Sequence, residues 1–124
     1  KIAGAAAEGV IITTSLDRDS TDPLAQAFIQ GFQKKSGYPA DMVSASTHTA
    51  VLVLAEAMKQ VDPSDKAALR QAIASTSINA ATGNISFNKL GEVRKSVQVQ
   101  VVRDGSWHHF AVISDPVLLA PPEE

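Results

Sequence analysis

The chain has 124 residues, the size of one small domain, and 44% of them are apolar, which is enough to build a packed core. Its formal net charge of −2 and its scattered basic residues exclude the clustered positive surface that binding to nucleic acid requires. It has no cysteine, which excludes a disulfide framework and thiolate metal sites, and no apolar run approaches the roughly 20 residues of a membrane span.

The first predicted elements are a short strand and a helix. The β-branched run at residues 10–12 predicts a buried strand. Asp22 and Pro23 fit the N-cap and the first position of a helix, because aspartate accepts free backbone N–H groups and proline has none to leave unpaired. The helix is expected to end at Gly37, since glycine adopts the left-handed conformation that closes helices.

Two more helices are predicted in the middle of the chain. Residues 42–44 fit a short strand, and Ser46 or Thr47 fits the N-cap of a helix that runs to about Val61. This helix is apolar on nearly all sides, which predicts that protein surrounds it. A third helix is expected after Ser64 and Asp65, with its polar side chains facing outward.

From Asn79 onward the pattern changes from helical to strand-like. Residues 85–87 alternate, and residues 97–101 alternate strictly between Val and Gln, which predicts a strand with one buried and one solvated face. Asp104 and Gly105 predict a hairpin turn into a final strand. The predicted class is therefore α/β with an antiparallel end. The helices need more sheet than the chain supplies, which suggests a piece of a larger protein.

No catalytic or metal-binding set stands out. His108 and His109 are neighbours on the last predicted strand, so they should point to opposite faces and cannot share a metal ion from there. Asp17 and Asp19 flank Arg18 in a loop, and we interpret these alternating charges as solvated. No Ser or Thr has an evident base partner. The sequence therefore predicts a protein that is not an enzyme and that uses no cofactor.

Five segments of the chain carry short motifs. They are Ala7-Glu8-Gly9-Val10-Ile11-Ile12-Thr13; residues 28–37 with Pro39; Ser46-Thr47-His48-Thr49-Ala50-Val51 with Leu54, Ala55, Ala57 and Met58; residues 82–92, Thr-Gly-Asn-Ile-Ser-Phe-Asn-Lys-Leu-Gly-Glu; and residues 97–107. In this order and spacing, over about residues 2–112, they resemble the last third of the type I periplasmic binding proteins of branched-chain amino acid ABC transporters. The chain departs from the family pattern at His48 and Thr49, where the family has Tyr-Asp, and at Asn88, where it has Asp.

The resemblance implies an α/β fold that is part of a two-lobe type I periplasmic binding protein, with three-layer αβα lobes joined by crossing hinge strands. Residues 1–15 and 97–113 would belong to one lobe, residues 16–96 to the other, and residues 114–124 would form a C-terminal tail. The expected hinge residues are Ser15, Asp17 and Ser96.

The resemblance also implies a function. The protein would be the periplasmic or extracytoplasmic component of a bacterial ABC transporter. It would capture a branched-chain amino acid or related small carboxylate between two hinged lobes and present it to the membrane permease subunits. The remainder of the same protein would supply most of the cleft. The candidate ligand contacts here are Val43, Ser44, Ala45, Ser46 and His48.

Three alternatives stay open from the sequence. The first is a sensory or regulatory ligand-binding domain of the same fold. The second is a small oligomeric interaction module that buries its apolar second helix against a partner. The third is a small α/β enzyme, for which the residues offer no catalytic constellation.

Overall fold

The computed structural model describes residues 3–120 and has a mixed α/β fold, as predicted. Its helices and strands, in chain order, are η1 (Gly4–Ala7), β1 (Ile11–Thr14), α1 (Pro23–Ser36), α2 (Met42–Met58), α3 (Lys66–Ser75), β2 (Ile78–Ala80), β3 (Gly83–Phe87), β4 (Val93–Arg94), β5 (Val97–Arg103) and β6 (Ser106–Ile113).

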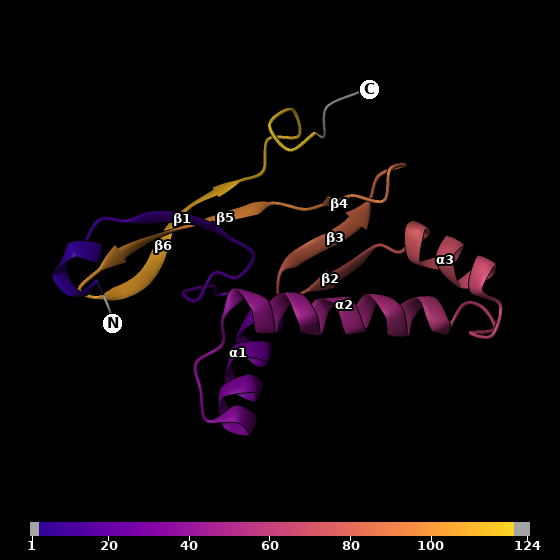
Figure 1. Cartoon of the computed structure of the whole chain (residues 1–124), viewed down its shortest axis with the longest axis horizontal. Helices are drawn as coiled ribbons and strands as arrows, with labels where there is room; N and C mark the ends of the chain where they lie inside the picture. Colours follow the sequence, from indigo (N-terminus) through magenta and orange to yellow (C-terminus); the bar gives the residue numbers. More distant parts are fainter. Residues whose placement is uncertain (1–2, 121–124) are drawn as a thin grey trace.

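The strands form two separate antiparallel sheets of three strands each. One has the order β1-β5-β6 and the other the order β2-β3-β4. Figure 1 shows the two sheets side by side, with α2 running along the half that contains β2 and β3, and α1 near the N-terminal end of α2. The chain therefore passes between the halves twice, at residues 15–22 and at residues 95–96.

Helix α1 forms as its sequence predicts. The Asp22 carboxylate accepts hydrogen bonds from the backbone N–H groups of Leu24 and Ala25, and Pro23 occupies the first turn. Gly37 closes the helix in the left-handed conformation, with φ of 76°. The predicted start and end of this helix are confirmed.

The beginning of α2 differs from the prediction. Residues 42–44 are helical rather than a short strand, because Asp41 is the N-cap in place of Ser46 or Thr47. The Asp41 carboxylate accepts from the Ser44 backbone N–H at 2.7 Å, and the Ser44 hydroxyl accepts from the Asp41 N–H at 3.0 Å. This reciprocal capping box satisfies two free donors at once, so the helix starts earlier than expected. It also ends earlier, at Met58 rather than near Val61.

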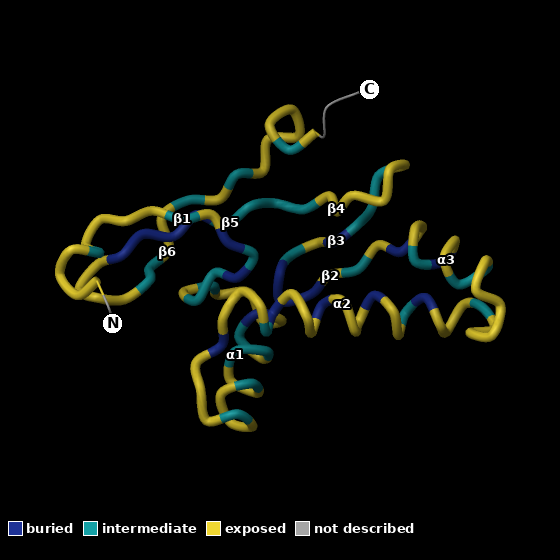
Figure 2. Tube along the Cα trace, in the orientation of Figure 1, coloured by how far each residue is buried: buried dark blue, intermediate teal, exposed yellow. Residues whose placement is uncertain are grey.

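Helix α2 buries one narrow stripe. The buried residues recur every four positions, which keeps them on one face: Ala45, Thr49, Val53 and Ala57. This face packs against β2 and α3. Figure 2 shows the resulting alternation of buried and exposed turns along the helix. Much of the remaining apolar surface, including Val51 and Leu54, is exposed within the described chain, so the expected enclosure of this helix is not present here.

Strand β5 is central in its sheet and is more buried than predicted. Four consecutive residues, 99–102, are buried, and Gln100 is 0% exposed. The predicted solvated face is wrong for this part of the strand, because the loop after β1 covers the Gln100 side. A register shift between Val99 and Gln100 accompanies this burial.

A small apolar cluster fixes the helices to the junction between the halves. Leu16, Ala40 and Ala45 are buried together, and three partly buried side chains of α1 pack on them: Phe28, Ile29 and Phe32. Leu16 follows β1, Ala40 precedes α2 and Ala45 lies in its first turns. The start of α2 is therefore held next to the first crossing segment.

Candidate functional site

The two crossing segments meet at the junction. The Lys95 ammonium donates a 2.6 Å hydrogen bond to the Ser15 hydroxyl, and burial lowers the pKa of Lys95. A Cβ placed on Gly83 would lie 3.6 Å from the Ser96 hydroxyl oxygen, so the β2–β3 turn also reaches this point. The structure thus brings the predicted hinge residues Ser15 and Ser96 to one place.

The third predicted hinge residue, Asp17, lies beside them. Asp17, Ser15 and Gln98 line a pocket of about 140 Å³ at the junction, together with residues of the β2–β3 turn. That Ser15, Asp17 and Ser96 act as a hinge stays a prediction.

Three of the predicted ligand contacts are accessible on the first turns of α2. Val43 is 64% exposed and lies next to the junction. Ser46 is exposed and borders an apolar groove described below. His48 is exposed and lies against Phe28 of α1, with ring centroids 5.0 Å apart.

The other two predicted contacts are already engaged. Ala45 is 0% exposed and its side chain packs in the junction cluster, so its role as a ligand contact stays a prediction. Ser44 uses its hydroxyl in the capping box with Asp41. Because residues 43–48 form a helix and not an extended loop, their side chains point in different directions rather than toward one site.

An apolar groove of about 350 Å³ lies between α2, α3 and the strands β3 and β4. Its walls are mainly apolar, with Lys95 as the cationic side chain among them. The lining includes Val53, Leu54, Ile73, Ile85, Phe87 and Val93. The sequence analysis missed this groove, because its lining comes from four elements whose apolar residues look individually like ordinary core positions.

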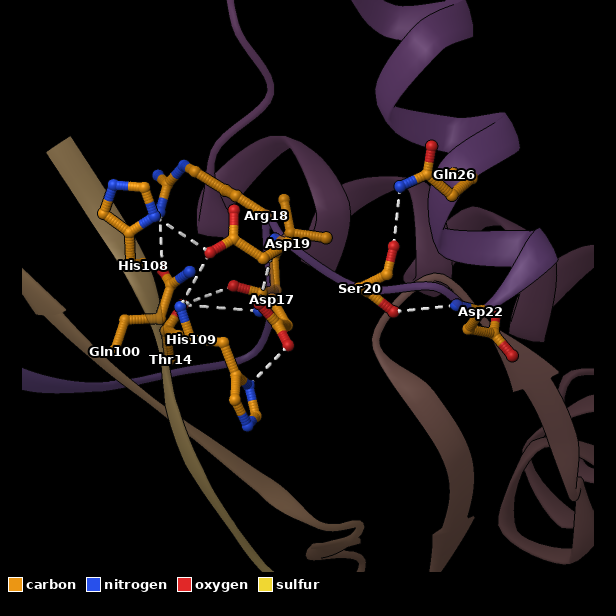
Figure 3. A network of polar contacts seen from close by, with 11 residues as sticks. Thr14, Asp17, Arg18, Asp19, Ser20, Asp22, Gln26, Gln100, His108 and His109 are labelled. Atoms are coloured by element: carbon orange, nitrogen blue, oxygen red, sulfur yellow. Dashed lines mark hydrogen bonds and ion pairs between the residues drawn. The ribbon is translucent and has the colours of Figure 1, made fainter.

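A polar network joins the first crossing segment to β6. Figure 3 shows Asp17 and Asp19 reaching toward the two adjacent histidines. The Asp17 carboxylate lies 2.7 Å from His109 Nδ1, and the Asp19 carboxylate lies 3.1 Å from His108 Nδ1 and accepts the His109 backbone N–H at 3.0 Å. That backbone hydrogen bond is the main cause of the lowered pKa of Asp19. The interpretation of these charges as merely solvated is therefore wrong.

Arg18, between these two aspartates, has different hydrogen-bond partners. Its Nη1 donates to Gln100 Oε1 at 2.8 Å, and its Nε donates to the Ala40 backbone oxygen at 3.3 Å. One guanidinium thus connects β5 to the residue that precedes the N-cap of α2.

Neither metal chemistry nor a membrane span is indicated in residues 3–120. No three His, Asp or Glu side chains of this part of the chain converge as metal ligands. None of its helices has the length and apolar content needed to cross a bilayer.

Comparison with solved structures shows close similarity to solute-binding proteins. A leucine-binding protein from Thermotoga maritima is 30% identical, covers 94% of this chain and has a TM-score of 0.83, and the match spans 34% of that protein. A leucine-, isoleucine-, valine-, threonine- and alanine-binding protein from Brucella ovis is 22% identical and has a TM-score of 0.83, with 98% of this chain and 35% of that chain covered.

A solute-binding protein of an ABC transporter from R. palustris, solved with benzoate, is 19% identical, with a TM-score of 0.81 over 90% of this chain and 31% of that one. The chain thus spans about a third of the length of these structures. No curated protein sequence matches it.

The family model described as "Periplasmic binding protein" matches residues 1–106. This match confirms the resemblance found in the sequence, and with the structural similarity it confirms the type I fold. The family and these structural neighbours are solute-binding proteins and not enzymes, as the sequence predicted. The chain belongs to the periplasmic binding protein family.

Proposed function

We propose that this chain is part of the solute-binding component of a bacterial ABC transporter and helps to capture a branched-chain amino acid or a related small carboxylate. The observation that carries the proposal is the position of the first turn of α2, which exposes Val43 and is packed against the first crossing segment through Leu16 and Ala45. The 30% identity to a leucine-binding protein over 94% of the chain supports this ligand class.

Within this function, Val43 contacts the apolar part of the ligand. Its side chain is 64% exposed, and it belongs to an element anchored to the junction. The ligand carboxylate is recognised elsewhere, because the Asp41 carboxylate already occupies the N-terminal end of α2 and would repel a second anion. Ser46 and His48 lie farther along the helix and border the ligand region.

The two halves of the chain belong to different lobes. Residues 1–15 and 97–113 contribute to one lobe, residues 16–96 to the other, and residues 114–124 form a tail. Two separate sheets connected by two adjacent crossing segments support this division. Ligand that contacts both lobes only in the closed state shifts the hinge equilibrium toward closure.

The partners of this function are the remainder of the same protein, which completes the cleft, and the membrane permease subunits that receive the closed form. The location is the periplasm or its extracytoplasmic equivalent, as the family description suggests. A sensory domain of the same fold would bind the ligand in the same way but would have no permease partner.

Isothermal titration of the full-length protein tests the proposal, with leucine, isoleucine, valine and benzoate as probes. At least one of these should bind, and Val43→Ala should weaken that binding by about tenfold, since removing two methyl groups loses roughly 1.5 kcal/mol. Val51→Ala is the matched control, because it removes the same two methyl groups from the same helix, about two turns farther than Val43 from the helix start that packs on Leu16. If no probe binds, or if both variants weaken binding equally, the proposed role fails.

A further inference from the structure

The tripeptide Asp17-Arg18-Asp19 contacts three separate elements from one short loop. Asp17 and Asp19 bind the two histidines of β6, while Arg18 binds β5 and the segment before α2 (Figure 3). The Asp17 backbone oxygen accepts from the Ser20 N–H at 3.3 Å, so the three residues lie in a tight turn, which directs their side chains to different partners. The contacts join residues that are 22 to 92 positions apart in the sequence.

Arg18 is placed to fix the start of α2. It donates to the Ala40 backbone oxygen, and Ala40 directly precedes the N-cap Asp41. Its other contact, Gln100, is fully buried in the central strand, and the amide Nε2 of Gln100 has no hydrogen-bond partner among the described residues. Arg18 therefore holds the buried amide of Gln100 by donating a hydrogen bond to the amide oxygen. A change in Arg18 would release both the strand amide and the helix start.

The histidine contacts hold the loop that carries Arg18. The charged groups around the two imidazoles are Asp17, Arg18 and Asp19, whereas β5 faces them with the uncharged Gln100 and Val101. The contacts on both sides of Arg18 therefore fix this loop to β6.

We propose that Asp17, Arg18 and Asp19 are positioning residues for ligand binding: they hold the first turn of α2 in place against the β1-β5-β6 sheet, and His108 and His109 hold the loop that carries Arg18. The ligand part of this inference rests on the proposed function. The mechanical part, a loop whose rigidity depends on two histidines, stands on the contacts alone.

The first experiment compares Arg18→Met, Arg18→Lys and Arg70→Met in the full-length protein. Arg70 lies exposed on α3 and serves as the matched control. Arg18→Met should lower the hydrogen-exchange protection of residues 15–22 and 40–48 and weaken leucine binding by about tenfold, as expected for a lost charged hydrogen bond. Arg18→Lys should restore part of both effects, because lysine keeps the charge but cannot reach both acceptors.

The second experiment measures hydrogen exchange in residues 15–22 of His108→Leu/His109→Leu. Leucine offers the two carboxylates no hydrogen-bond partner, so protection should fall several-fold relative to the wild type. His108→Gln/His109→Gln should restore part of the protection, since glutamine keeps a side-chain donor. His48→Gln, measured only through the exchange of residues 15–22, should leave the protection unchanged.

The two proposals can fail separately. If the wild type binds none of the probes while the exchange results appear as expected, the ligand function is wrong and the positioning loop remains. If leucine binds but Arg18→Met changes neither exchange nor affinity, the positioning role is overturned. Unchanged protection in His108→Leu/His109→Leu overturns the part assigned to the histidines, and circular dichroism confirms that each variant is folded.

Discussion

At the junction of the two sheets, the large side chains that are completely buried are Leu16 and Gln100. Burying an amide is favourable only where its polar atoms find partners. Gln100 meets this condition through Oε1, which accepts from Arg18, and fails it at Nε2, which has none in the described chain. In Gln98, which lies two positions earlier, the buried Oε1 has no hydrogen-bond partner among the described residues.

These two glutamines predict responses of different size to the same substitution. Gln100→Met removes the acceptor of a charged donor and should lower the free energy of unfolding by about 1–3 kcal/mol. Gln98→Met removes an unsatisfied oxygen and should change stability by less than about 0.5 kcal/mol. Urea unfolding of both variants checks this. An equal loss in the two variants would show that side-chain volume, and not hydrogen bonding, determines stability at this strand.

Asp41 gives a second prediction at the residue scale, because it caps α2. Asp41→Ala removes the capping box and should destabilise the protein by about 1 kcal/mol. Hydrogen bonding from the Ser44 backbone N–H is the main cause of the lowered pKa of Asp41. A carboxyl whose pKa is lower in the folded state stabilises the fold above its ordinary pKa and loses this effect as pH falls through the folded value.

The stability difference between wild type and Asp41→Ala should therefore be full at pH 7 and shrink toward about pH 2, as measured by denaturant unfolding across that range. A difference that stays constant with pH would mean that the cap acts only through the polarity of its side chain and not through its charge.

Residue-level environments were the least predictable feature of this sequence. The Val-Gln alternation of β5 indicated a solvated glutamine face, but Arg18, 82 positions away, covers Gln100. The same holds for Asp17 and Asp19, whose histidine partners lie about 90 positions later. A local pattern reports which residues could be buried and not which distant side chain will meet them.

At the scale of elements, a pair of buried hydroxyls joins α2 to the β2–β3 turn and tests how the inner face of α2 is held. Thr49 and Thr82 bind each other at 2.9 Å, and both are buried. Thr49→Val keeps the shape but leaves the Thr82 hydroxyl without this partner, which should reduce stability by about 1–3 kcal/mol. Thr49→Val/Thr82→Val should reduce stability by less than the sum of the two single substitutions, because no hydroxyl of the pair is then left unsatisfied.

A double-mutant cycle by chemical denaturation measures that coupling. Additive effects would show that each hydroxyl has another acceptor, and the contact between α2 and the β2–β3 turn would then rest on apolar packing alone.

Elements with strong local signals were predicted correctly. Helix α1 has Asp22-Pro23 at its start and Gly37 at its end, and the β5–β6 hairpin has Asp104-Gly105 at its turn. The start of α2 was predicted wrongly, because Ser46 and Thr47 are also residue types that favour the N-cap position. The reciprocal contact between Asp41 and Ser44 sets the start of the helix, and the sequence analysis considered neither residue as a cap.

For the whole molecule, the sequence predicted an α/β protein with more helix surface than its own sheets cover, and the structure shows that surplus on α2. The ligand contacts could be predicted only as a stretch of residues, since the helical geometry of residues 43–48 separates their side chains. The family followed from the order of five short motifs, none of which is specific alone, and the match over residues 1–106 confirms it.

The exposed apolar surface of α2 leads to a prediction about the isolated chain. Val51, Leu54 and Met58 are all at least 41% exposed, and an apolar groove of about 350 Å³ adjoins them. Contiguous apolar surface of this kind drives association unless other protein covers it. The 124-residue chain alone should therefore sediment as more than its 13.0 kDa monomer and bind a hydrophobic dye.

Lysine at two of these positions tests whether the rest of the protein covers this apolar surface or leaves it open. Val51→Lys/Leu54→Lys should return the isolated chain to a monomer, because like charges prevent the apolar faces from meeting. In the full-length binding protein, the same double variant should lower the melting temperature by several degrees, since the surface would there be packed against the rest of its lobe. If the full-length protein tolerates both lysines unchanged, this surface is open in the complete molecule, and the interaction-module alternative becomes the better account of it.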